Sequence, residues 1–171
     1  MYQRILVPVD GSATSERGLT EAIAIARMSG GSIRLLHVLD ELVFVTGFET
    51  GASYAKTVLP EMRKHSEEIL ITARERAVAA GIDADTLCIE CFGRRPADLI
   101  VEQATAWPAD LVVLGTHGRR GVRRLVLGSD AEQVLRMASV PVLLIRSADD
   151  GVAAARTPAA QAVADSGAVA R

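Results

Sequence analysis

Five short apolar runs are spaced along the chain and predict the strands of one sheet. They cover residues 5–9, 33–38, 86–92, 111–114 and 140–145. All except the run at 86–92 are nearly continuous in isoleucine, leucine and valine, whereas a strand with one face in water alternates apolar with polar residues. Continuous apolar strands are typical of a parallel sheet covered by helices on both faces. The pattern therefore predicts an α/β domain.

The segments between these runs have helical spacing and recognisable ends. Serine at an N-cap, proline in a first turn, and glycine or proline after a last turn are the usual signals. The signals stand at Ser12, Gly30, Gly81, Pro96 and Pro141. Strands and helices alternate, and each crossover is long enough for a right-handed parallel connection. We therefore expect one doubly wound domain over residues 1–146.

Two segments fall outside this alternation. Residues 40–56 contain glycine and threonine and are expected to form a loop or lid between the second strand and the second helix. Residues 147–171 hold ten alanines and no leucine, isoleucine, methionine or aromatic residue. Because this tail offers little to bury, we expect it to be disordered or loosely helical, and expendable.

Composition narrows the class of protein. The 171 residues are 49% hydrophobic and carry a net charge of −2, which excludes disorder for most of the chain and argues against nucleic-acid binding. The sequence has neither an apolar run long enough to span a membrane nor a signal peptide, so no membrane association is expected. Two cysteines, Cys88 and Cys91, are expected to be buried free thiols in a reducing compartment. Together these features predict a cytoplasmic protein.

The most informative motif follows the fourth apolar run. Gly115, His117 and Gly118 are followed, after nine residues, by Gly128 and Ser129. Gly118 permits either a close approach of the backbone or a positive φ. A helix that begins after Gly128 would direct its free N–H groups and positive dipole end toward phosphate. The spacing favours a polyphosphate site, although the familiar lysine-containing phosphate loop and the three-glycine dinucleotide motif are both absent.

Two alternatives stay open at this motif. Residues 129–132 also fit a capping box, in which Ser129 caps the helix and Glu132 reaches back to the cap amide. Arg119 and three further arginines between the glycines could bind ligand phosphate, contact RNA or a partner, or be solvated. Few aromatic residues accompany them, so the RNA interpretation is the weakest.

The chain resembles the universal stress protein family. The resemblance extends from residues 5–12 to residues 140–145, and the Gly-x2-Gly-x9-Gly-Ser pattern is the signature of that family's ATP-binding branch. It implies a five-stranded parallel sheet of order 3-2-1-4-5 and a homodimer. The first and fourth strands would then be neighbours, with Asp10 and Gly115 facing each other where an open sheet leaves its crevice.

The resemblance also implies roles for individual residues. Pro8, Val9 and Asp10 would line the nucleotide site, and Val38 would lie beside the adenine. A carboxylate next to a triphosphate is repulsive, so Asp10 would act through a bridging Mg²⁺ or Mn²⁺ or, alternatively, as a turn residue. Asp130 departs from the family, which usually has an apolar residue there. Its charge would complement a helix N-terminus but repel phosphate.

The glycine motif together with the resemblance implies an ATP-binding stress-response regulator. Binding of ATP, or of another adenine nucleotide, would bias contacts with an unknown protein partner, with slow hydrolysis at most. The homodimer would form through the fifth strand, with Val140, Val142 and Leu144 at its apolar edge. The alternative is a nucleotide-free dimeric interaction module of the same fold.

Overall fold

The computed structural model describes residues 2–40, 56, 58–118 and 127–146. Five strands alternate with helices along this part of the chain. The strands are β1 (Arg4–Pro8), β2 (Ser32–Asp40), β3 (Ala84–Cys91), β4 (Leu111–Gly115) and β5 (Val142–Ile145). The helices are α1 (Ala13–Ser29), α3 (Leu59–Ala79), α4 (Pro96–Ala106) and α5 (Ser129–Met137). The predicted loop at 40–56, apart from Asp40 and Lys56, and the tail at 147–171 lie outside the described residues.

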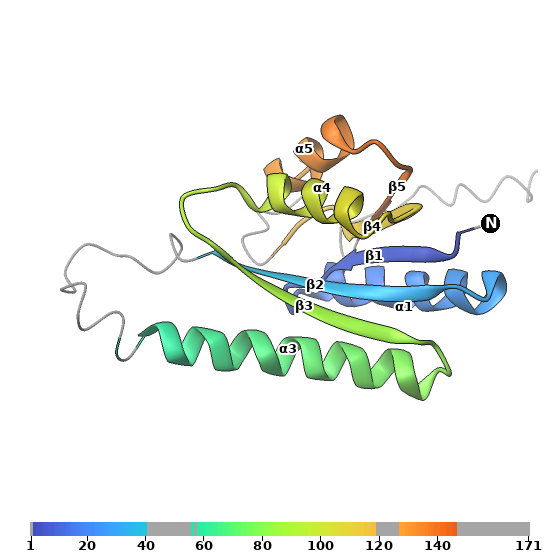
Figure 1. Ribbon diagram of the computed structural model, residues 1–171, viewed down its shortest axis with the longest axis horizontal. Helices are drawn as coiled ribbons and strands as arrows, with labels where there is room; N and C mark the ends of the chain where they lie inside the picture. Colours follow the sequence, from blue (N-terminus) through green and yellow to red (C-terminus); the bar gives the residue numbers. More distant parts are fainter. Residues whose placement is uncertain (1, 41–55, 57, 119–126, 147–171) are drawn as a thin grey trace, which may run out of the picture.

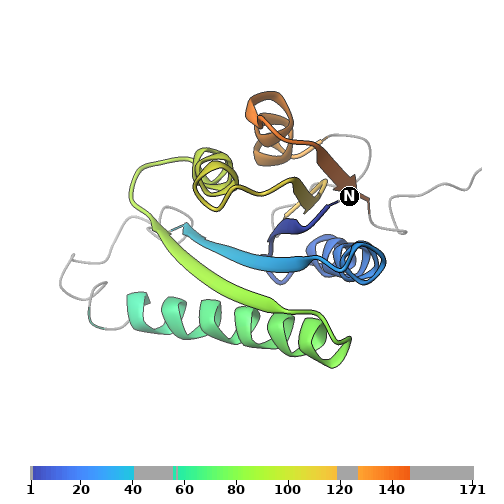
Figure 2. The ribbon, with the colours of Figure 1, turned by 45° about the vertical axis from the view of Figure 1, so that its right-hand side comes forward.

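The strands form one parallel sheet in the order β3-β2-β1-β4-β5, which confirms the expected fold class and order. α1 and α3 cover one face, and α4 and α5 cover the other (Figures 1 and 2). β1 pairs with both β2 and β4. The chain therefore leaves the sheet in opposite directions from β1 and β4, and their carboxyl ends border the crevice of this open sheet.

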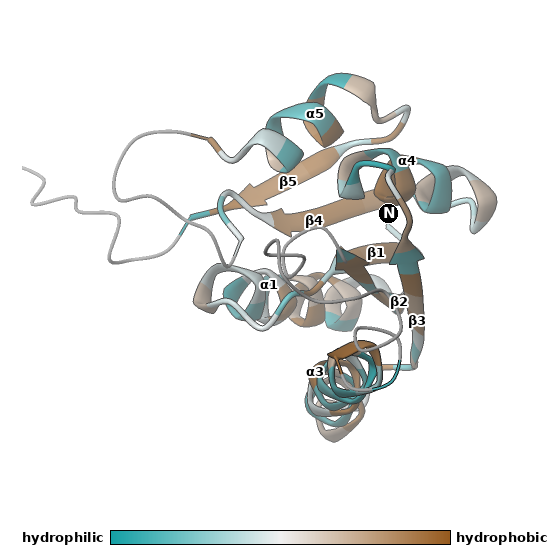
Figure 3. Cartoon of the chain, turned by 90° about the vertical axis from the view of Figure 1, so that its left-hand side faces the viewer, coloured by the Kyte–Doolittle hydropathy of each residue, from teal (hydrophilic) through white to brown (hydrophobic). Residues whose placement is uncertain are grey.

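Each face of the sheet has its own hydrophobic core. Alternate side chains of the central strands, such as Ile5 and Leu6, point to opposite faces and are fully buried. Ile5 belongs to the core under α1 and α3, and Leu6 to the core under α4 and α5. Figure 3 shows the result, with brown apolar strands between helices that carry teal polar positions. Burial on both faces explains the continuous apolar runs in the sequence.

The helix ends follow the sequence signals at α1. The Ser12 side chain accepts a hydrogen bond from the Ser15 N–H, and Gly30 ends the helix with a φ of +68°. The next glycine is required for space, because a Cβ atom on Gly31 would lie 2.7 Å from the Tyr2 carbonyl oxygen. This close approach lets the turn after α1 deliver β2 directly beside β1.

Three expectations need correction. Val140 lies outside β5, because the ladder with β4 begins at the carbonyl of Pro141, which accepts from the Val112 N–H at 3.0 Å. The third strand ends at Cys91, and Phe92 is exposed. Cys88 is exposed on the edge strand β3, whereas Cys91 is buried, so only one of the two thiols is hidden as expected.

Within the described residues, no helix is long and apolar enough to cross a membrane.

Candidate functional site

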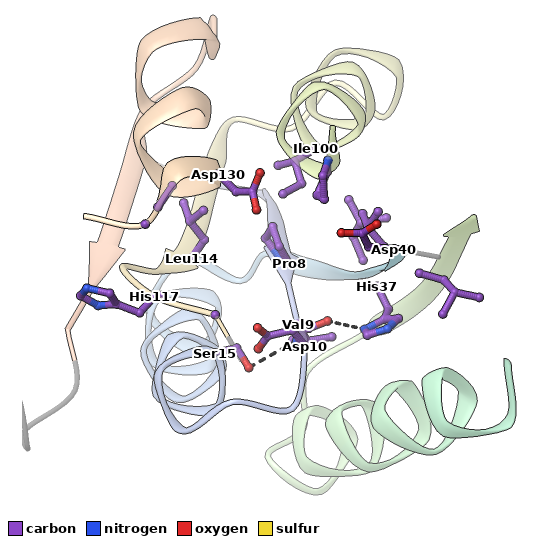
Figure 4. Close-up of a pocket in the computed structure, with 18 of the residues that line it drawn as sticks. Pro8, Val9, Asp10, Ser15, His37, Asp40, Ile100, Leu114, His117 and Asp130 are labelled. Carbon is purple, nitrogen blue, oxygen red and sulfur yellow. Dashed lines mark hydrogen bonds between the residues drawn. The ribbon is translucent and has the colours of Figure 1, made fainter. Parts of the chain in front are cut away.

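A cavity of about 590 Å³ lies at the carboxyl end of the sheet (Figure 4). Its size is within the range of about 300–1,000 Å³ that is usual for small-molecule sites. The cavity is lined by every predicted site residue that the structure describes. These are Pro8, Val9, Asp10, Val38, Gly115, His117, Gly118, Gly128, Ser129 and Asp130. Arg119 lies outside the described residues.

The turn from β1 into α1 fixes the position of Asp10. The Asp10 carboxylate accepts a hydrogen bond from the Ser12 N–H at 2.9 Å, and Ser12 in turn caps α1. The Asp10 N–H donates to the Ser15 hydroxyl at 3.4 Å. This chain of local bonds gives Asp10 the turn role that the sequence left open. It also holds the carboxylate at the edge of the cavity.

Gly118 lies directly against this carboxylate. A Cβ atom on Gly118 would come 2.7 Å from Asp10 Oδ2. The sequence predicts either a positive φ or a close approach of the backbone at Gly118. Gly118 does not have a positive φ, so the close approach is the reason for a glycine here. The segment after β4 and the turn after β1 therefore meet in the cavity, as the strand order requires.

Gly115 brings the same segment against α1. A Cβ atom on Gly115 would lie 2.9 Å from the Cβ of Thr14. The Thr14 hydroxyl donates a hydrogen bond to the carbonyl of His117. The backbone between Gly115 and Gly118 is thus held to the first turn of α1 before it reaches Asp10.

The start of α5 differs from the capping-box interpretation. Gly128, not Ser129, is the N-cap residue, and no side chain makes a cap hydrogen bond. Glu132 instead forms an ion pair with Arg136 at 2.8 Å. The Gly128 N–H donates to the Thr116 carbonyl at 2.8 Å, and a Cβ atom on Gly128 would lie 3.0 Å from that oxygen. Ser129 is therefore the first residue of the helix, at the end that favours negative charge.

The imidazole of His117 takes a different direction from its backbone. Its Nδ1 lies 3.0 Å from the Thr116 hydroxyl oxygen. Its Nε2 is buried and has no hydrogen-bond partner among the described residues. In Figure 4 the ring points away from Asp10. The His117 backbone is therefore held beside the cavity by Thr14, whereas its side chain points away from Asp10.

Several lining residues were missed by the sequence reasoning. α3 contributes Met62, His65 and Ser66, and α4 contributes Ile100. Nothing in the sequence shows how these helices dock, so no local signal could have found them. Asp40 was also missed, although it ends β2 at the same edge of the sheet where Asp10 follows β1. That shared edge was an available signal.

The chain matches the family model described as the universal stress protein family over residues 1–146. The chain belongs to the universal stress protein family. It is 33% identical to a universal stress protein of Methanocaldococcus jannaschii, with 85% of this chain and 83% of that protein covered. It is 30% identical to universal stress protein YxiE of Bacillus subtilis, with 85% and 100% covered.

Solved universal stress proteins share the fold. The UspA protein of Lactobacillus plantarum is 26% identical, with a TM-score of 0.72 and coverage of 85% of this chain and 98% of that chain. A universal stress protein in complex with cAMP is 29% identical, with a TM-score of 0.58 and coverage of 85% and 97%. The Archaeoglobus fulgidus protein in complex with dAMP is 26% identical, with a TM-score of 0.59 and coverage of 84% and 98%.

The cavity of this universal stress protein is lined by groups of both negative and positive charge. Asp10, Asp40 and Asp130 contribute carboxylates, whereas the N-terminal turn of α5 contributes backbone N–H groups and the positive end of a helix dipole. Backbone donors attract an anion, and carboxylates attract a cation. The arrangement therefore suits an anionic ligand that arrives together with a cation.

Proposed function

We propose that this universal stress protein binds an adenine nucleotide, in the first place ATP, in the cavity at the carboxyl end of its sheet. The observation that carries the proposal is the convergence of Asp10, Gly118 and Gly128 on one cavity from three separate segments. Two structural relatives are complexes with cAMP and dAMP, which supports an adenine nucleotide as the ligand class. In the proposed complex the phosphates lie near Gly118, Gly128 and the first turn of α5.

A divalent cation fits the donor set only together with the nucleotide. The described residues contain no group of three or more histidine, cysteine or acidic side chains that could hold a metal ion. Mg²⁺ is commonly bound by one or two carboxylates plus substrate phosphates. In this proposal Asp10 is the protein ligand, and the cation offsets the repulsion between its carboxylate and the phosphates.

The proposed output is regulation through binding. Bound nucleotide would alter the contacts that this protein makes with a protein partner. A homodimer would form by pairing of β5, which is an edge strand of the sheet, with a second copy. The side chains of Val140, Val142 and Leu144 lie half-buried toward α4 and α5. These side chains therefore pack against the core of their own protomer, and in this proposal the backbone of β5 forms the hydrogen bonds to β5 of the second copy.

The ligand can be identified directly from the purified protein. Mass spectrometry of small molecules released by denaturation should find an adenine nucleotide in near-stoichiometric amount. If the protein is first stripped of nucleotide, it should bind nucleotide again when ATP and Mg²⁺ are supplied. A preparation that carries no nucleotide and does not reload would support the nucleotide-free interaction module instead.

A further inference from the structure

The cavity passes over the end of the sheet and has one end on each face. On β2, Leu36 and Val38 belong to the core under α4 and α5, whereas His37 between them points to the face under α3. Ile100 of α4 lines the same end as Leu36 and Val38. This apolar end has the side chains that favour burial of a flat heterocycle.

Two carboxylates lie at the apolar end. Asp40 follows Val38 by two residues on β2, so the two side chains share a face. Asp130 projects from the first turn of α5, and in Figure 4 its carboxylate points toward Pro8 and Ile100, with Asp40 on the other side of them. Burial raises the pKa of the Cys91 thiol, and the charges of Asp40 and Asp130 raise it further, which is consistent with both lying near Cys91.

We propose that Asp40 and Asp130 select the base of the bound nucleotide by accepting hydrogen bonds from an exocyclic amino group. This inference rests on the proposed nucleotide-binding function. An ionised carboxylate only accepts hydrogen bonds. Adenine presents an amino donor at its six-position, whereas guanine presents a carbonyl acceptor there, as hypoxanthine does. A base with a carbonyl at this position would place like partial charge, and no donor, opposite a carboxylate that faces the six-position, because its nearest donor is the neighbouring N1–H.

The same geometry gives Asp130 a role that its sequence position did not suggest. From the sequence, its charge was expected to repel phosphate. In the structure its side chain points to the apolar end of the cavity, while Gly118 and Asp10 meet at another part of the lining. The acidic side chain and the phosphate-binding backbone at the start of α5 therefore serve different parts of one ligand.

The test compares ATP with ITP, whose base has a carbonyl in place of the amino group at the six-position and a hydrogen on the neighbouring N1. Both are titrated calorimetrically, with Mg²⁺, into the nucleotide-stripped full-length protein. A hydrogen bond to a charged group predicts a preference for ATP of about 10- to 100-fold. Asp40→Asn and Asp130→Asn each supply an amide donor and should lower the ratio by weakening ATP binding and strengthening ITP binding. Asp83→Asn, at an exposed aspartate outside the cavity lining, should leave the ratio unchanged.

The outcomes separate this inference from the function on which it rests. Equal affinity for ATP and ITP in the unmodified protein would overturn the base-selection role and leave nucleotide binding standing. A preference that persists unchanged in both asparagine variants would also overturn it. Failure of both nucleotides to bind would instead contradict the proposed function itself, and the base-selection role with it.

Discussion

At the scale of single residues, the cavity depends on glycines that allow close approach and on a carboxylate fixed by its own turn. The need for small residues at Gly115 and Gly118 could be predicted from their spacing after a buried strand. Their contacts could not, because Thr14 and Asp10 lie about a hundred residues earlier in the chain. Ser129 shows the limit of local patterns. Its capping-box sequence is intact, yet the backbone places Gly128 at the cap and leaves Glu132 to pair with Arg136.

Cys88 provides a prediction at this scale. Although the residue is exposed overall, partial desolvation of its sulfur and the negative charge of Glu90 raise the pKa of the Cys88 thiol above its usual value, and Ser66 and Arg63 partly oppose this. At pH 8 the thiolate fraction is therefore lower than in an ordinary cysteine, and the thiolate is the nucleophile. Iodoacetamide should modify Cys88 more slowly than a cysteine in an unstructured peptide, as measured by mass spectrometry over a pH series.

Glu90→Gln is the matched variant for this experiment. It removes the like charge beside Cys88 and releases Arg63 from its ion pair with Glu90, whose N–O distance is 2.6 Å. Both effects lower the pKa of the thiol, so the variant should react faster at pH 8. A Cys88 rate equal to that of the peptide, or unchanged by Glu90→Gln, would contradict this account. Cys91 is buried and should react more slowly than Cys88 in either protein.

At the scale of elements, the alternation of strands and helices was predictable because each strand is buried on both faces and each crossover is long. The strand limits moved by only one or two residues. What the sequence could not show is which helix residues reach the cavity, since that depends on how α3 and α4 lie across the sheet. The contributions of Met62, Ser66 and Ile100 come from this docking.

The edge strand β5 gives the prediction at this scale. The carbonyls of Pro141 and Ile145 accept hydrogen bonds from β4 and the residue after it. By the two-residue period of a strand, Val142 and Leu144 therefore direct their N–H and C=O groups to the open edge. Leu144→Pro removes one of these donors and should shift the proposed dimer toward monomer in sedimentation experiments.

Leu144→Ala is the control, because it also loses the leucine side chain but keeps the N–H group. The alanine variant should be destabilised, by about 2 kcal/mol or somewhat more for a half-buried leucine, yet should remain dimeric. If the unmodified protein is a monomer at micromolar concentration, the proposed dimer is contradicted. Equal dissociation of the two variants would assign the effect to the side chain instead of the edge backbone.

At the scale of the whole molecule, the family model covers residues 1–146 and stops where the alanine-rich tail begins. The tail has no large aliphatic or aromatic side chain to bury. Deletion of residues 147–171 should therefore change the melting temperature by no more than about 2 °C, as measured by calorimetry. A fall of several degrees would show that the tail docks on the domain through its backbone or its alanines.

The central claim is that the cavity between β1 and β4 binds ATP through the backbone at Gly118, and calorimetric titration of the stripped protein with ATP and Mg²⁺ tests it most directly. The unmodified protein should bind. Gly118→Ala should weaken binding at least about tenfold, because its Cβ would lie 2.7 Å from Asp10 Oδ2 and displace the carboxylate. Gly18→Ala is the matched control, since its Cβ would make only ordinary contacts at 3.8 Å. No heat from the unmodified protein at millimolar ATP, or equal affinity in Gly118→Ala, would contradict the account.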